Sequence, residues 1–277
     1  MKKFITLFIL VATIFLGANS IVAKTSQAKR AKATTTKSNK KPTRSSTPTV
    51  VQSQPIELDN GMTIVKYSLD MSKGRSFGFN YSIEWPVSGP EPLTKECRNF
   101  IASVVNNSDA KLKLNNGDVS ISNFIESKYK SFLKDRKEEF PDNDGDILDY
   151  CNIFFKADSK KTIISANTDY YTTDASGVHG DGVSKMFLNN GKTLDYSMLP
   201  PIEVMKPIIL KYICEFGDPA DDPQEYDYLD YPYLPPVVVD GNLVFDYGFE
   251  GGMYITSSIP VFEIISLASS ELLEFLQ

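Results

Sequence analysis

Apolar and polar residues alternate along the stretch that begins the folded part of the chain. Between Phe77 and Trp85 every second residue is aromatic or aliphatic. Because successive side chains of a strand point to opposite faces, this period of two predicts strands with one buried face. We therefore expect strands at Thr63–Asp70 and Ser76–Trp85.

The apolar spacing then changes to three and four residues, which is typical of helices. Pro92 precedes an apolar stripe that starts at Leu93 and that Asn106 can end, which predicts the first helix. A second stripe, with Lys and Glu on its other side, predicts a helix at Ser122–Glu139.

The second half of the chain mixes both patterns. Further strands are expected at Ile147–Ala157, Thr162–Thr172, Pro236–Val239, Leu243–Tyr247 and Met253–Ser258, with a loop at Asp174–Asp181. Asn190-Gly191 predicts a type I′ hairpin turn, and a second hairpin crosses Asp240-Gly241.

Two more helices are expected in this half. One stripe runs from Val204 to Phe216 and is followed by Gly217, a common residue just after a helix. Pro207 interrupts this stripe, so the regular helix either starts there or is kinked. The C-terminal stretch, Val261–Leu276, is expected to be largely helical.

Strands joined by hairpins, with helices between the blocks, predict the α+β class. We expect antiparallel sheets with packed helices in two small subdomains, residues 55–145 and 146–277. No internal repeat is visible in the sequence.

The formal net charge of −6 hides a split between tail and body. Residues 1–54 hold 10 of the 29 Lys and Arg and none of the 35 Asp and Glu, so this part carries +10 and residues 55–277 carry 19 − 35 = −16. Such asymmetry is typical of a tail joined to a folded body.

Residues 1–23 resemble a secretory signal peptide: Lys2 and Lys3, an apolar run, then small residues. An uncleaved anchor is the alternative, although the run is short for a span of ~20 residues. Residues 24–54, rich in Lys, Thr and Ser, are expected to be a disordered basic linker, either a plain spacer or a tether to anionic envelope polymers. We expect an exported, periplasmic or extracellular protein, with no transmembrane span in its mature form.

His179 is the one histidine and lies in the run Ser176-Gly177-Val178-His179-Gly180-Asp181. A Ser-His-Asp triad needs residues that converge in space, and these are consecutive on one expected loop. We therefore expect His179 to fix the backbone of this loop, and no catalytic residue is predicted. The loop around His179 is also a candidate binding interface.

Two other groups of residues carry weaker signals. Asp142, Asp144 and Asp146 resemble the first half of a calcium loop, but Ile147 and Ile153 occupy the positions where such a loop needs Gly and Glu. A polar turn is the preferred interpretation. Cys97, Cys151 and Cys214 allow one disulfide at most, with buried, inert thiols as the main expectation. No cofactor is predicted.

The segment 218–233 is the strongest candidate binding site. Acidic residues and tyrosines alternate along it with no basic residue between them; they are Asp218, Asp221, Asp222, Glu225, Tyr226, Asp227, Tyr228, Asp230, Tyr231 and Tyr233. Carboxylates steer a cationic partner, and tyrosine gives contact area and a hydrogen bond. A solvated surface loop is the alternative. Nucleic-acid binding is not expected, because an acidic body repels phosphate.

Several short motifs resemble the RsiV/PdaC-type extracytoplasmic domain family. They are Ser165–Tyr171, the run Ser176–Gly180, Phe187–Leu199, Leu243–Tyr247 and Ile259–Ile265. The N-terminal stretch Phe79–Val105 is similar to the companion domain that usually precedes these motifs. The sequence departs from the family at Ser176-Gly177-Val178 and at Gly248–Gly252, where the family has an aromatic run.

The resemblance implies a non-catalytic extracytoplasmic module without an enzyme's active site. In the anti-sigma factor of this family the module binds lysozyme, a cationic protein. The chain is accordingly expected to bind a cationic protein such as lysozyme at the cell envelope, with an accessory protein for peptidoglycan or another carbohydrate as the alternative. An unrecognised hydrolase is a third reading, although no carboxylate pair stands out in the sequence.

Overall fold

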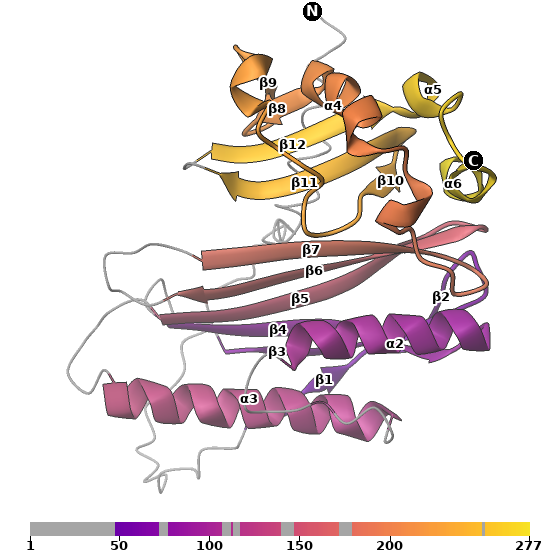
Figure 1. Cartoon of the computed structure of the whole chain (residues 1–277). Helices are drawn as coiled ribbons and strands as arrows, with labels where there is room; N and C mark the ends of the chain where they lie inside the picture. Colours follow the sequence, from indigo (N-terminus) through magenta and orange to yellow (C-terminus); the bar gives the residue numbers. More distant parts are fainter. Residues whose placement is uncertain are drawn as a thin grey trace, which may run out of the picture. The chain divides into compact units, whose positions relative to one another are not determined.

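The computed structural model describes residues 48–71, 77–106, 112, 117–139, 147–171, 179–250 and 253–277. These ranges form five helices and two sheets of mostly antiparallel strands (Figure 1). The expected α+β class is therefore confirmed. No helix within these ranges is both long and apolar enough to cross a membrane.

The first sheet has seven strands in the order β1-β3-β4-β5-β6-β7, with β2 also paired to β3. β4 and β5 are parallel, and the other neighbours are antiparallel. The strands are β1 (Val51–Gln52), β2 (Ile56–Glu57), β3 (Thr63–Asp70), β4 (Phe77–Ser88), β5 (Ile147–Ala157), β6 (Lys161–Tyr171) and β7 (His179–Leu188).

Helices α2 (Glu91–Val105) and α3 (Gly117–Glu139) connect β4 to β5 and pack on one face of this sheet. The alternation in β4 explains the packing, because Phe79, Tyr81 and Trp85 all point to that face and are buried there. The Phe79 ring stacks on the Tyr81 ring at 4.5 Å and meets the Tyr129 ring of α3 at 5.1 Å. These contacts form the larger of the two main cores.

The second sheet has five strands in the order β10-β11-β12-β8-β9. Its strands are β8 (Ile213–Glu215), β9 (Asp218–Pro219), β10 (Val237–Val239), β11 (Asn242–Glu250) and β12 (Met253–Pro260). The helical elements of this part are α4 (Ile202–Lys211), α5 (Val261–Ile264), α6 (Ser270–Leu276) and the 3-10 turns η2 (Tyr196–Met198) and η3 (Pro223–Tyr226).

The face of the first sheet that α2 and α3 leave uncovered is here called the helix-free face. The second sheet and its helices contact one end of it. Ile163 of β6 and Met186 and Leu188 of β7 point to that face and join the core of the second sheet. Lys161 Nζ also donates to the Phe275 carbonyl at 2.9 Å. The rest of that face, further along the strands, carries mostly polar side chains together with Phe154.

The expected boundary between residues 145 and 146 is wrong as a division between sheets. It falls between β4 and β5, whose residues pair from Phe77 with Ile147 to Ile83 with Ile153. The chain leaves the first sheet only after β7, near residue 189. The sequence suggested a boundary at 145 because pairing between strands so far apart in the chain leaves no local signal.

The helical stripe expected from Val204 to Phe216 is only partly correct. α4 ends at Lys211, and Pro207 lies inside it. Ile213 belongs to β8 and pairs with Ser257 of β12, so this apolar residue is part of a strand and not of the helix. Pairing with β12 therefore replaces the last turn that the local spacing predicted.

One of the two expected hairpin turns differs from expectation, and the other is present as expected. Gly191 has a φ of 84°, but Asn190 is not left-handed, so Asn190-Gly191 does not form a type I′ turn. At Asp240-Gly241 both residues have positive φ, 49° and 77°, as type I′ requires. A side chain at position 191 would also approach the Pro92 carbonyl carbon to 2.9 Å, so glycine is needed there for close packing as well.

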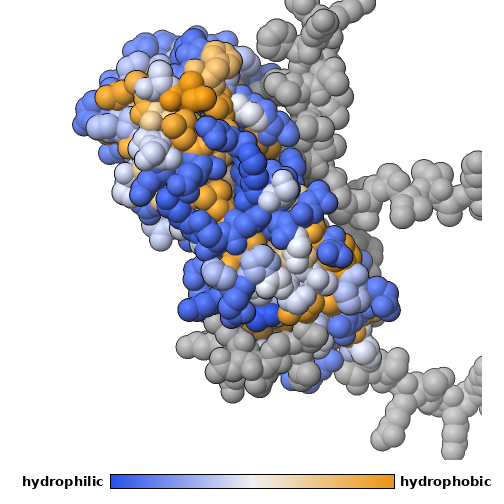
Figure 2. Space-filling view, turned by 90° about the vertical axis from the view of Figure 1, so that its right-hand side faces the viewer, coloured by the Kyte–Doolittle hydropathy of each residue, from blue (hydrophilic) through white to orange (hydrophobic). Residues whose placement is uncertain are grey.

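The C-terminal stretch is largely helical as expected, but it forms two short helices. α5 and the turn after it carry three exposed large apolar side chains: Phe262, Ile265 and Leu267. Figure 2 faces the side on which α5 and α6 lie in Figure 1 and shows hydrophobic residues gathered in its upper part. The apolar surface is thus concentrated on the part of the molecule built around the second sheet.

Candidate functional site: the acidic tyrosine segment

The segment 218–233, here called the acidic tyrosine segment, joins the second sheet at its β9 edge. Phe216 and Gly217, both with positive φ, turn β8 into β9, where Glu215 pairs with Asp218. Asp222 then caps η3, because its Oδ1 accepts a hydrogen bond from the Gln224 amide at 3.0 Å. Asp230 Oδ1 likewise accepts a hydrogen bond from the Tyr231 amide at 2.7 Å, so two carboxylates of the segment have a local structural role.

Two tyrosines of the segment point inward. Tyr226 is only 8% exposed and packs with Leu210, Leu229 and Ile255. Burial, together with its hydrogen bond to Glu215, raises the pKa of Tyr226 to about 12. Its hydroxyl therefore stays protonated at neutral pH and anchors the segment.

Tyr231 forms the second anchor. Its ring lies between those of Tyr196, at 4.9 Å, and Phe245, at 5.7 Å, and both pairs are stacked. Its hydroxyl donates to the Pro200 carbonyl at 2.6 Å. Burial, with a smaller contribution from Asp230, raises the pKa of Tyr231 to about 12. The Tyr196 hydroxyl in turn lies within hydrogen-bond distance of the carbonyl oxygens of Pro232 and Leu234 and donates its one hydrogen to either of them.

The acidic side chains of the segment point to solvent. All six are exposed: Asp218, Asp221, Asp222, Glu225, Asp227 and Asp230. Across the described parts of the chain, no Lys, Arg or His nitrogen lies within 4.0 Å of any of these carboxylates. Lys206 is near, but its Nζ donates to the Asp227 backbone carbonyl at 2.8 Å. The negative charge of the segment is therefore available to a partner.

The other two tyrosines are exposed beside these carboxylates. Tyr228 is 66% exposed and Tyr233 is 97% exposed. The segment thus divides its four tyrosines equally: Tyr226, which is buried, and Tyr231, which is half-buried, act as anchors, and the other two rings are presented outward. A partner would meet aromatic rings and carboxylates on a segment that is already fixed in place.

The remaining candidates lie elsewhere. His179 was expected in a loop, but it is the first residue of β7 and its backbone pairs with Tyr170 of β6, which corrects that expectation. The loop before it and Asp142, Asp144 and Asp146 lie outside the described residues. The described residues contain no group of three His, Cys, Asp or Glu placed to hold a metal ion.

The three cysteines form no disulfide with one another. Cys97 and Cys151 are buried in the first core, and burial raises the pKa of each thiol to about 12. Cys214 is less buried, and burial raises the pKa of its thiol as well. Protonated thiols in apolar surroundings are weak nucleophiles. The burial of Cys97 and Cys151 agrees with the expectation of buried thiols, whereas Cys214 is only half-buried.

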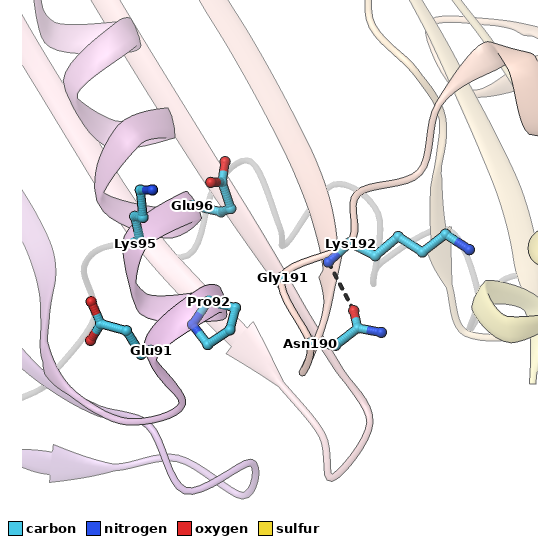
Figure 3. A pocket seen from close by; sticks show the side chains of 7 residues that line it. All are labelled: Glu91, Pro92, Lys95, Glu96, Asn190, Gly191 and Lys192. Carbon is cyan, nitrogen blue, oxygen red and sulfur yellow. Dashed lines mark hydrogen bonds between the residues drawn. The ribbon is translucent and has the colours of Figure 1, made fainter.

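A cavity of about 690 Å³ opens between α2 and the turn after β7 (Figure 3). Its lining mixes charges of both signs: Glu91, Pro92, Lys95, Glu96, Asn190, Gly191 and Lys192. Lys192 extends away from Glu91 and Lys95 in Figure 3, and its Nζ lies 3.6 Å from a Glu274 oxygen. This cavity therefore does not gather its charged groups around one point.

The residues that support the segment were missed by sequence reasoning. Tyr196, Lys206 and Phe245 each hold part of it, yet they lie outside the segment in sequence. No local pattern links them to it. The alternation of acid and tyrosine located the segment, but not the direction in which each tyrosine points.

Comparison with known proteins adds no family assignment. No protein-family model matches the chain, and no curated protein matches it significantly. The resemblance to the RsiV/PdaC-type family therefore stays a prediction.

Proposed function

We propose that this chain is an exported, non-catalytic binding module of the bacterial cell envelope that recognises a cationic protein through the acidic tyrosine segment. The carrying observation is a set of six exposed carboxylates on one anchored segment, beside two exposed tyrosines. Among the described residues, none of these carboxylates has a Lys, Arg or His nitrogen within 4.0 Å. A cationic protein supplies the Lys and Arg side chains that such a surface lacks.

The physical argument has two parts. Exposed carboxylates on a body of net charge −16 attract a cationic partner over a distance and speed its encounter. Tyr228 and Tyr233 then supply contact area at low cost in conformational entropy. Because Tyr226 and Tyr231 already hold the backbone, binding orders little additional chain.

The compartment and the choice of partner rest on the sequence. The signal-peptide pattern of residues 1–23 supports export. The resemblance to the RsiV/PdaC-type family supports lysozyme as the first partner to test, and a role in binding without catalysis. The sequence suggested a disordered linker up to residue 54, but Val51 and Gln52 form β1 and pair with β3, so the last part of that stretch belongs to the first sheet. The basic stretch before β1 leaves the acidic body free to bind while it contacts the envelope.

The test is calorimetric titration of the purified chain with lysozyme at ~0.05 M and ~0.15 M salt. We expect binding at both salt concentrations. Replacing two carboxylates that hold no local hydrogen bond, Asp221→Asn with Asp227→Asn, should weaken it by about fivefold or more.

The matched control removes the same charge from exposed positions outside the segment, Glu57→Gln with Asp59→Asn. It should weaken binding clearly less than the first pair. Equal effects of the two pairs would reduce the interaction to general charge attraction, as would binding that disappears at ~0.15 M salt, and either result would contradict the proposal.

A further inference from the structure

The helix-free face of the first sheet carries an ordered row of small polar side chains. Ser68 of β3 pairs with Ser82 of β4, which pairs with Asn152 of β5. Asn152 pairs with Asn167 of β6, and Asn167 pairs with Gly182 of β7. At ~4.8 Å between strands, this row crosses five strands over about 19 Å.

A second row runs beside the first on the same face. Phe154 pairs with Ser165, which pairs with Ser184, and the two serine hydroxyls lie 2.9 Å apart. At the β3 end of this row Lys66 pairs with Glu84, so its two charges cancel. Phe154, two residues from Asn152 on the same strand, is half-buried and gives the face an aromatic ring.

The two asparagines are unpaired within the described structure. Their side chains are half-buried and make no hydrogen bond to another described residue. Each amide offers two N–H donors and an acceptor oxygen, and both amides lie next to each other on the central strands. Gly182 adds no side chain at the β7 end, which leaves room for a ligand to approach the backbone.

The charge of this face decides which ligand fits. The body carries −16, yet these two rows carry no net charge. A polycation would prefer the acidic tyrosine segment, and a polyanion is repelled by the body as a whole. An uncharged chain with many hydroxyl and amide groups matches the face, because it can exchange hydrogen bonds with Asn152 and Asn167 while an apolar ring face packs on Phe154.

We propose that this face binds an uncharged glycan strand. The sugar hydroxyls and any N-acetyl groups pair with Asn152 and Asn167, and one sugar ring lies on Phe154. Met186 and Leu188 contact the second core and so mark one end of the polar face. The glycan would lie across β4–β7 on the far side of that contact. This site is separate from the acidic tyrosine segment and does not depend on the function proposed for that segment.

The experiment titrates the purified chain with two uncharged oligosaccharides, cellohexaose and the hexamer of β-1,4-linked N-acetylglucosamine. We expect one or both to bind with an affinity that is unchanged between ~0.05 M and ~0.5 M salt, since a neutral ligand is not screened. Asn152→Ala with Asn167→Ala should weaken that binding about tenfold, because two hydrogen-bonding amides are lost. Phe154→Leu should weaken it as well while keeping an apolar side chain.

Asn99→Ala is the matched control, since it removes an exposed amide from α2. It should leave glycan binding unchanged, as should Asp221→Asn with Asp227→Asn. Thermal melting of each variant confirms that it is folded. A chain that binds neither oligosaccharide, or binds them equally well without Asn152 and Asn167, would overturn the proposal. A dimer in sedimentation that the same two substitutions dissociate would assign the face to a second copy of the chain and overturn it too.

Discussion

The two faces of the seven-stranded sheet come from the same strands but differ in chemistry wherever the second core does not pack on them. On the face under α2 and α3, β4 contributes Phe79, Tyr81, Ile83 and Trp85, all buried. On the other face the same strand contributes Ser82 and Glu84, both half-buried. The difference teaches that one alternating pattern specifies a core on one side and a polar surface on the other. The proposed glycan site lies on the polar side, whose side chains are not needed for the core under α2 and α3.

The largest effect is expected on the helix-covered face. Phe79→Ala removes a ring that contacts Tyr81, Tyr129 and Phe132 and leaves a cavity. We expect the free energy of unfolding to fall by about 3–5 kcal/mol, measured by urea denaturation. Ser68→Ala on the opposite face is the control. A loss below about 1 kcal/mol for Phe79→Ala would break the contrast between the faces.

An intermediate effect is expected at Glu84, the charged exception on the polar face of β4. Its carboxylate accepts a hydrogen bond from the Phe155 amide at 2.8 Å. Burial raises the pKa of Glu84 above its ordinary value of 4.5, although this hydrogen bond and Lys66 oppose the shift. The folded chain thus holds this proton more tightly than the unfolded chain, so the contribution of Glu84 to stability falls as the pH rises from 4.5 through the raised pKa.

Glu84→Gln keeps an acceptor for the Phe155 amide and removes the titration. Relative to the parent chain, the variant should gain stability between pH 4 and pH 7, as measured by urea denaturation at several pH values. Glu57→Gln, at an exposed position, should show no such trend. A Glu84→Gln variant that loses relative stability over this range would show that the hydrogen bond and Lys66 outweigh burial.

The smallest effect is expected for Asn152→Ala with Asn167→Ala. Neither side chain makes a hydrogen bond to another described residue, so the free energy of unfolding should change by less than about 0.5 kcal/mol per substitution. Thermal and urea melting check this. A loss of several kcal/mol would mean that the polar face holds the fold together, and the two faces would then not differ as we describe.

Periodic patterns predicted the elements of the fold well where each strand or helix signals itself locally. The expected ranges Thr63–Asp70 and Ile147–Ala157 match β3 and β5. The prediction failed where distant pairing decides, as at Ile213, which β12 recruits into a strand. Which strands share a sheet depends on the same distant pairing, so the expected boundary at 145 was wrong.

The candidate site shows the same limit. Composition located the acidic tyrosine segment, because charge and aromatic content are local properties. It gave no means to tell the anchors Tyr226 and Tyr231 from the exposed Tyr228 and Tyr233, since Tyr196 and Phe245, which hold Tyr231, lie elsewhere in the sequence. The polar row on the first sheet was missed for a similar reason: its members are single residues on five strands.

The parallel pairing of β4 with β5 has a consequence for how the chain assembles. Ile83 and Ile153 become neighbours only after the whole connection through α2 and α3 has been closed, and closing so long a loop is slow. The hairpins β3–β4 and β5–β6 can form earlier, because each joins strands that are close in sequence. The pairing of β4 with β5 at the centre of the sheet is therefore the last to form. A chain cut between residues 145 and 146 would expose the edges of β4 and β5, and the sheet could re-form only when both fragments are present.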